Sequence, residues 1–282
     1  MSFAGMSIVQ GSPQSIWVPV VPATTIYVGG IVCIVSSAPE EGVIMLPDAN
    51  GVANDTNLDV PLGVCIGTNR KNPLFNSTEL TEYITAPAAG DAFGGASIEY
   101  VGVEGPWAKG DPIPMVKVAL IDPSTVIRAP LRVAAIGTAP SVETVTSQTT
   151  GGSTGVGFTS GTMDFTSIAN DMQTIYFRSG GNAGTYRLNN SASATAALFA
   201  KATRNSIEIG DTFVIVPVRS HGYSTVMFDD ATAMFIDCAD APVLNGTDRW
   251  IISVVRLDLA TAGNEYCEFR FDPVHFQHYS VA

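Results

Sequence analysis

The sequence predicts an all-β protein built of two small barrel or sandwich domains. Short runs of β-branched and aromatic residues recur along the chain, and clusters of Gly, Pro, Asn and Asp separate them. Good helix formers occur in series only at 193–203, so we expect at most one short helix. With 282 residues, the chain is long enough for two domains with substantial cores.

The clearest strand pattern lies at 98–118. Two apolar runs, 98–103 and 113–118, are separated by breakers that include Gly110-Asp111, which predicts a strand, a corner and a second strand. Gly210-Asp211 precedes another apolar run in the same way. Each predicted domain therefore has a Gly-Asp corner before a buried strand, although a motif this short does not establish a duplication.

The first predicted domain spans residues 16–138. Besides the pair just described, its strands are expected at 17–21, 25–28, 31–35, 43–46, 62–66, 80–85 and 126–133. Short strands at close intervals are typical of a small barrel or sandwich. Residues 1–15 are rich in Gly, Ser, Gln and Pro, and we expect them to form an extended arm that docks on a neighbouring subunit.

A change of composition marks the end of this domain. Residues 139–161 are rich in Ser, Thr and Gly with few large apolar side chains, which predicts a linker. The second β domain then spans 162–282 and contains the short helix expected at 193–203. Its strands are expected at 173–178, 185–188, 213–218, 225–228, 233–237, 249–257 and 266–271. The pattern does not decide whether the two domains are separate or interleaved.

The composition limits the classes of partner. Charged residues make up 14% of the chain, below the roughly 25% typical of soluble domains, so we expect neighbouring subunits to cover much of the surface. A net charge of -12 argues against binding to nucleic acid, which requires clustered Lys and Arg. The most apolar window, 16–35, is interrupted by Pro and Gly, and the first residues lack the pattern of a signal peptide. We therefore expect no membrane partner.

The four cysteines are far apart and include no C-x-x-C pair: Cys33, Cys65, Cys238 and Cys267. Cys33 and Cys65 each lie between Val and Ile in an apolar run, where a small buried thiol fits well. We therefore expect free thiols and folding in a reducing cytoplasm.

Two segments resemble catalytic motifs without their context. Ser153 lies in a G-x-S-x-G match, but its flanks offer neither the buried strand nor the helix that position a nucleophile in hydrolases. His221 is followed by Asp229 and Asp230, and a His/Asp pair can act as acid and base. No nucleophile or substrate-holding motif accompanies the pair, so we expect no enzyme activity.

Three further segments carry ligand atoms for ions. His275 and His278 have an H-x-x-H spacing with Cys267 as a third donor, but a closed zinc site needs three or four converging ligands. The segment 48–59 is rich in oxygen ligands without the spacing of an EF-hand, and a turn-forming loop explains it better. The Gly-rich segment 178–187 lacks the ending of a P-loop, and we interpret it as a hairpin turn. We expect no metal and no cofactor.

Short segments rich in Gly and β-branched residues recur in the first domain at 25–35, 60–67, 98–103 and 109–113. In these segments the domain resembles the small β-barrel decoration, or cement, proteins of tailed-bacteriophage heads. These proteins often have short strands in the order G-x-x-V, x-G-V-x-x-G and V-x-x-x-G-D-x-V. The resemblance covers roughly 17–133, and Gly29-Gly30 lies at the centre of its first segment. It implies a β-tulip or SH3-like first domain and no enzyme activity. It also implies a place on the capsid exterior after synthesis in the host cytoplasm.

The partner implied by the resemblance is the major capsid protein, bound by homotrimers at local three-fold points of its lattice. The residues expected at the capsid or subunit interface are apolar positions of the arm and the first domain: Phe3, Met6, Ile8, Trp17 and Trp107. A different class of function stays open, namely a receptor- or glycan-binding fibre, tail spike or adhesin that uses exposed aromatic rings such as Trp107, Tyr223 or Trp250.

Overall fold

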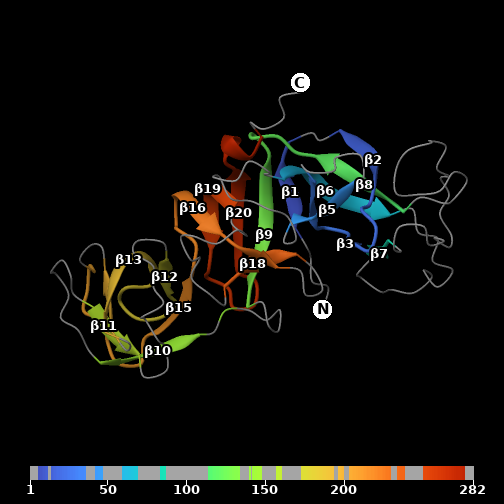
Figure 1. The fold of residues 1–282 in the computed structure, drawn as a ribbon. Helices are drawn as coiled ribbons and strands as arrows, with labels where there is room; N and C mark the ends of the chain where they lie inside the picture. Colours follow the sequence, from blue (N-terminus) through green and yellow to red (C-terminus); the bar gives the residue numbers. More distant parts are fainter. Residues whose placement is uncertain are drawn as a thin grey trace, which may run out of the picture.

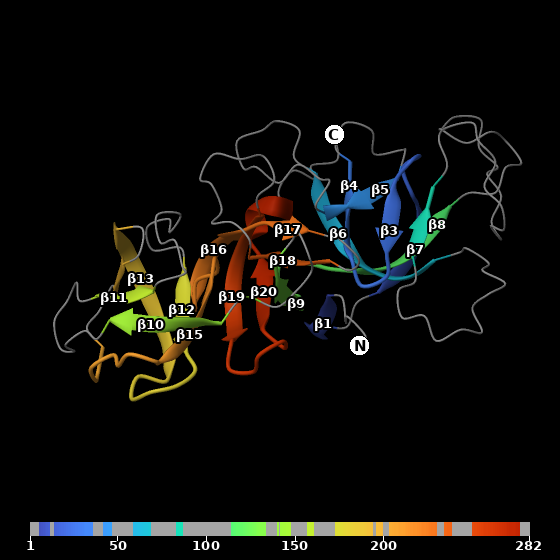
Figure 2. The ribbon, with the colours of Figure 1, turned by 90° about the horizontal axis from the view of Figure 1, so that it is seen from below.

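The computed structural model confirms the all-β prediction. It describes residues 6–11, 14–35, 42–46, 59–68, 83–86, 114–133, 140, 142–147, 157–160, 173–193, 196–199, 203–229, 234–238 and 250–276. Within these ranges the chain forms strands β1 to β20 and one short 3-10 helix, η3 (Pro273–Phe276). The strands make a curled five-stranded sheet, a seven-stranded sheet and a closed barrel. Figures 1 and 2 show these three bodies in a row, with the seven-stranded sheet in the middle.

The five-stranded sheet has the strand order β2-β8-β6-β4-β5 and is antiparallel throughout. Its strands are β2 (Ser15–Pro19), β4 (Ile31–Ile34), β5 (Val43–Met45), β6 (Val60–Thr68) and β8 (Met115–Leu120). A separate pair, β3 (Thr25–Tyr27) and β7 (Tyr83–Thr85), accompanies it. An isolated bridge joins Val20, just after β2, to Val43 on the opposite edge strand. The sheet therefore curls toward a barrel, as expected for the first domain.

A glycine permits this closure. Gly42 precedes β5 with a φ of +123°, in a region that side-chain-bearing residues rarely adopt. A Cβ at this position would also overlap the carbonyl oxygen of Pro19 at the end of β2. The two edges of the curled sheet approach each other because residue 42 has no side chain.

The seven-stranded sheet combines the two ends of the chain. Its order is β16-β19-β20-β9-β18-β17, and β1 also pairs with β9. The strands are β1 (Ser7–Gln10), β9 (Val126–Arg132), β16 (Gly222–Val226), β17 (Phe228–Asp229), β18 (Phe235–Asp237), β19 (Trp250–Asp258) and β20 (Tyr266–Phe271). The pairs β9–β20 and β9–β18 join segments predicted to lie in the first and second domains. The predicted division into 16–138 and 162–282 is therefore corrected, because the halves share one sheet.

The closed barrel has the order β10-β11-β14-β13-β12-β15. Its strands are β10 (Glu143–Ser147), β11 (Gly157–Ser160), β12 (Thr174–Phe177), β13 (Gly184–Ser193), β14 (Ala196–Phe199) and β15 (Thr212–Val216). The predicted linker, 139–161, thus contributes two barrel strands. The chain enters the barrel after β9 and leaves it before β16, so the barrel is an insertion in the seven-stranded sheet.

The helix expected at 193–203 is not formed. Ala196–Phe199 is strand β14, which pairs with β11 on one side and with β13 on the other. The intrinsic helix preference of Ala amounts to less than about 1 kcal/mol per residue. Closing the barrel pairs the main-chain groups on both edges of β14 and removes an open sheet edge, and this tertiary gain overrides the local preference.

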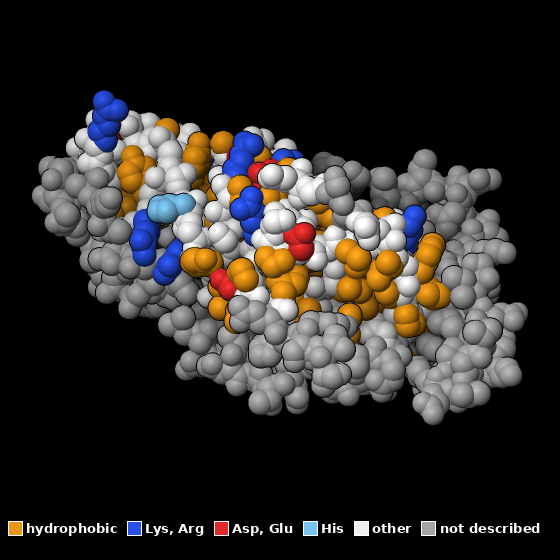
Figure 3. Space-filling view, turned by 90° about the horizontal axis from the view of Figure 1, so that it is seen from above, with side chains coloured by type: hydrophobic (Ala, Val, Ile, Leu, Met, Phe, Trp, Pro, Cys, Tyr) orange, Lys and Arg blue, Asp and Glu red, His pale blue; other side chains and the backbone are white. Residues whose placement is uncertain are grey.

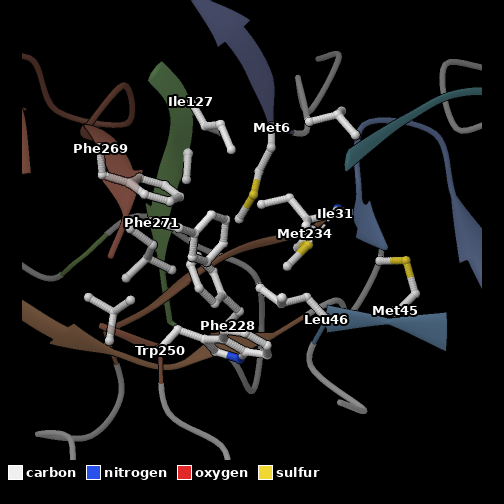
Figure 4. Close-up of a cluster of buried hydrophobic side chains, with 14 of the residues drawn as sticks. Met6, Ile31, Met45, Leu46, Ile127, Phe228, Met234, Trp250, Phe269 and Phe271 are labelled. Carbon is white, nitrogen blue, oxygen red and sulfur yellow. Dashed lines mark hydrogen bonds between the residues drawn. The ribbon is translucent and has the colours of Figure 1, made fainter. Parts of the chain in front are cut away.

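Two hydrophobic cores result from this arrangement. The larger core extends from the five-stranded sheet into the seven-stranded sheet, and Figure 4 shows Met6 and Met234 between Ile31 and the rings of Phe269 and Phe271. The smaller core fills the barrel with Phe158, Phe177, Phe199, Phe213 and neighbouring aliphatic residues. Within the described ranges, no helix has the length and hydrophobicity that a membrane crossing requires.

Strand β15 belongs to both cores. Phe213 and Ile215 point into the barrel, whereas Val214 and Val216 join the larger core. Because successive side chains of a strand alternate between its faces, the outer wall of the barrel packs against the body of the protein. The barrel therefore packs against the larger core through a hydrophobic contact, in addition to its two connections along the chain.

Candidate functional site

The candidate site is the exposed β2 edge of the five-stranded sheet, which we call the β2 surface and define by Ile16, Trp17, Ile66 and Lys117. Ile16 and Trp17 are consecutive in β2, so their side chains flank this edge on opposite faces of the strand. Ile16 is 40% exposed and Trp17 43% exposed on β2, the edge strand of the sheet. Trp17 lies opposite Lys117 of β8. In Figure 3, hydrophobic side chains gather over this sheet, beside a Lys or Arg side chain.

Local sequence features produce this surface. Val116 and Val118 of β8 face the core, so the alternation of the strand turns Lys117, and with it Trp17, to the other face. A β-bulge in β6 places Cys65 opposite Val118 and Gly67 opposite Lys117. Ile66 is the extra residue of this bulge, and its side chain is exposed.

Edge strands usually carry charges that discourage other chains from pairing with them. The sequence of β2 is SIWVP, which contains no charged residue and places its proline at the last position. In the described residues, β2 pairs along its length with β8 alone. An uncharged edge with exposed apolar side chains is the kind of surface that binds another protein.

The predicted interface residues are placed unequally. Trp17 is exposed and belongs to the β2 surface. Met6 is only 3% exposed and lies in the larger core, and Ile8 is half-buried against that core. The arm expectation is corrected for these residues, because β1 pairs with β9 of the same chain and leaves Met6 no surface for a partner. Phe3 and Trp107 lie outside the described residues.

The catalytic alternatives are not assembled by the described residues. Strand β16 separates His221 from Asp229, and its five residues span about 16 Å. His221 instead lies 2.9 Å from the hydroxyl of Ser220, measured from Nδ1 to Oγ. Ser153 and Asp230 lie outside the described residues.

The metal alternative fails at His275. Its side chain is buried, and its Nε2 accepts a hydrogen bond of 2.9 Å from the Ile251 N–H, so the ring is already committed. Burial lowers the pKa of His275 to about 4, while the nearby carboxylate of Asp272 acts in the opposite direction. Within the described ranges, no cluster of His, Cys, Asp or Glu could hold a metal ion. His278 and residues 48–58 lie outside these ranges.

The Gly-rich segment 178–187 is a hairpin, as predicted. Phe177 of β12 pairs with Gly184 of β13, and the Ala183 N–H donates to the Gly180 carbonyl in the turn. Arg178 is not available to bind a phosphate group, because its guanidinium binds the buried carboxylate of Glu265. This ion pair was not predicted, because nothing in the sequence relates residues 87 positions apart.

A shallow polar pocket lies at the turn between β8 and β9. The residues that line it are Gly11, Gln14, Leu120, Ile121, Asp122, Ser124 and Thr125. The Asp122 carboxylate accepts hydrogen bonds from the Ser124 N–H and hydroxyl and from the Thr125 hydroxyl, which lower its pKa. These bonds stabilise the turn itself, so the pocket is a weaker candidate than the β2 surface.

The glycan-binding alternative loses one of its rings. Trp250 is buried in the larger core and contacts Phe271, so it cannot bind a sugar. Tyr223 remains 58% exposed on β16, the edge strand of the seven-stranded sheet. No family model, curated protein or solved structure matches this chain. Its function is therefore argued from its own residues.

Proposed function

We propose that this chain is a virion structural protein that binds the outer surface of a capsid as a decoration, or cement, protein. The observation that carries the proposal is the β2 surface, where the edge strand β2 has no charged residue and exposes Ile16 and Trp17. The low charged fraction of 14% supports it, because surfaces that neighbouring subunits cover need fewer charges. The resemblance of residues 17–133 to capsid decoration proteins points to the same role.

In this proposal the curled first sheet binds the major capsid protein, and homotrimers form at the three-fold points of the lattice. The seven-stranded sheet and the inserted barrel extend away from that contact, in line with the row of three bodies in Figure 2. A stable protein interface buries roughly 800 Å² on each partner. Many copies bound at repeated positions stabilise a shell through multivalency, so no single contact needs to be strong.

The position of β1 changes which residues make the contact. Residues 7–10 belong to the protein's own sheet, so they are not free to reach a neighbouring subunit. Removing the segment 1–15 would therefore disturb the fold as well as any contact. The proposal assigns binding to the β2 surface, whose side chains can be changed without opening the core.

The first experiment is quantitative mass spectrometry of gradient-purified particles from the native source. Near-stoichiometric amounts relative to the major shell protein are expected, whereas absence from particles would overturn the proposal. A few copies per particle would instead indicate a fibre or tail component.

A second experiment tests the surface itself. The double variant Ile16→Ser/Trp17→Ser should fold normally and lose at least tenfold in affinity for particles that lack this protein. Tyr223→Ser is the matched control, because Tyr223 is also an exposed aromatic residue on an edge strand but lies on a different sheet. Unchanged particle binding by a folded double variant would refute the role of the β2 surface.

The second candidate function is glycan binding through Tyr223, which is the most exposed aromatic side chain among the described residues. Aromatic rings stack on the apolar faces of sugars, and an exposed tyrosine on an edge strand offers such a ring. A glycan array that gives signals with the wild-type protein and with Ile16→Ser/Trp17→Ser, but not with Tyr223→Ser, would favour this candidate.

A further inference from the structure

The 3-10 turn η3 (Pro273–Phe276) joins two of the three bodies. It follows β20 directly, it contacts β6 of the five-stranded sheet, and Phe276 packs against the larger core. The turn therefore lies where the five-stranded and seven-stranded sheets share the larger core. Loss of its contacts would loosen that junction without breaking a strand pairing of either sheet.

One side chain fastens this turn to the seven-stranded sheet. Nε2 of His275 accepts the N–H of Ile251 at 2.9 Å, and the Ile251 carbonyl accepts the N–H of Asp272 at 3.0 Å. Asp272 also accepts the Val274 N–H with its side chain, which shapes the turn. The bond from Ile251 requires an unprotonated Nε2, so the proton of the neutral ring is on Nδ1.

The surroundings of the ring oppose its protonation. His275 is only 2% exposed, and its ring lies 4.9 Å from that of Trp250 and 6.1 Å from that of Phe271. Asp272, on its own turn, is the charged group that acts on it. Trp250 and Ile251 of β19 and Phe271 of β20 are uncharged, and β6 carries no acidic or basic side chain.

We propose that η3 is an acid-released clasp: a proton on Nε2 of His275 replaces the lone pair that Ile251 uses, and the turn then leaves the sheet. Two donors, the imidazolium and the Ile251 N–H, would otherwise face each other in an apolar site. Release exposes Trp250 and the side of the larger core that η3 covers. This device does not depend on the proposed role in a particle.

The size of the effect follows from linkage. A histidine in the released turn has an ordinary pKa near 6.5, whereas burial lowers the pKa of the clasped ring to about 4. The stabilising contribution of the neutral ring is fully present above pH 6.5 and is lost as the pH falls from 6.5 toward 4. A difference of about 2.5 pH units corresponds to a roughly 300-fold increase in the opening equilibrium at the acidic limit.

Amide hydrogen exchange of the full chain tests the clasp. The protection factor of the Ile251 N–H, corrected for the intrinsic pH dependence of exchange, should fall by at least 30-fold between pH 7 and pH 4. In His275→Gln the side-chain oxygen can accept the same N–H without titrating, so its protection should stay constant over this range. His221→Gln is the control, because His221 is exposed, and it should behave like the wild-type protein.

The outcomes separate cleanly. Constant Ile251 protection in the wild-type protein, or an acid-induced loss that persists in His275→Gln, would overturn the proposal. Should His275→Gln not fold, NMR titration of the imidazole signals in the wild-type protein decides instead, with assignments from His221→Gln and His278→Gln. A midpoint of His275 near 4 that coincides with loss of Ile251 protection supports the clasp, and a midpoint near 6.5 without that loss refutes it.

Discussion

Arg178 and Glu265 form an ion pair that joins the inserted barrel to the seven-stranded sheet. Arg178 follows β12 of the barrel, and Glu265 immediately precedes β20. The Glu265 side chain is fully buried and also accepts the Gly263 N–H, while the Arg178 Nε–H donates to the Leu259 carbonyl at 3.0 Å. The guanidinium of Arg132 lies 3.9 Å away on the other side of the carboxylate. This network, together with the Val214 and Val216 side chains of β15, holds the barrel against the rest of the protein.

Breaking this pair should strongly destabilise the protein. Arg178→Ala leaves a buried carboxylate without its closest partner, and Glu265→Ala leaves a largely buried guanidinium. We expect each to lower the free energy of unfolding by about 3–5 kcal/mol. The control is Arg256→Ala, because the Arg256–Asp258 pair is more exposed and should be worth less than about 1 kcal/mol.

Urea unfolding of the three variants measures these differences. Replacing both partners by Met should cost less than either single alanine change, because no charge is then left buried. Equal effects of Arg178→Ala and Arg256→Ala would contradict the structural importance of the buried pair.

A side chain at residue 42 should oppose closure of the five-stranded sheet. Gly42→Ala adds a Cβ where the Pro19 carbonyl already lies and also strains a backbone with a φ of +123°. Backbone strain of this kind costs about 1–3 kcal/mol, and the overlap adds to it. Gly210→Ala is the matched control, since Gly210 has a φ of +94° but open space around its Cβ position. Thermal unfolding should place Gly42→Ala clearly below Gly210→Ala, and equal melting temperatures would contradict the close approach.

The N-terminal strand should contribute to stability rather than act as a free arm. Met6→Ala removes a buried side chain from the larger core, and changes of this kind cost about 2–5 kcal/mol. Val9→Ala, in β1 three residues after Met6 but exposed, should change stability by less than about 0.5 kcal/mol. Chemical unfolding distinguishes the two, and a neutral Met6→Ala would show that the segment leading into β1 is not part of the folded core.

The buried cysteines should be unreactive in the native protein. Cys33, Cys65 and Cys267 are fully buried, and none of the four cysteines is paired in the structure. Burial and the charge of Asp59 raise the pKa of Cys33, and burial and the charge of Glu268 raise that of Cys267. The thiolate is the reactive form, so a thiol reagent at pH 8 should modify these residues only after denaturant is added. Their rapid modification in native buffer, read by mass spectrometry of peptides, would contradict the burial.

Local features of this protein could be predicted from the sequence alone. The all-β class follows from short apolar runs and their Gly, Pro, Asn and Asp breakers, which act over a few residues. The hairpin between β12 and β13 and the burial of Cys33 and Cys65 were predicted for the same reason. Trp17, a candidate interface residue, is exposed on an edge strand, and its role in binding stays a prediction.

The tertiary structure alone decided which strands meet. The sequence of 143–147 reads as a linker and that of 196–199 as a helix, yet both are barrel strands because closing a sheet pairs main-chain groups that would otherwise be open. Met6 is buried, and Glu265 meets Arg178, because strands and charges far apart along the chain come together. Pairing energies of this kind depend on the partner and not on the local sequence, so no local pattern records them.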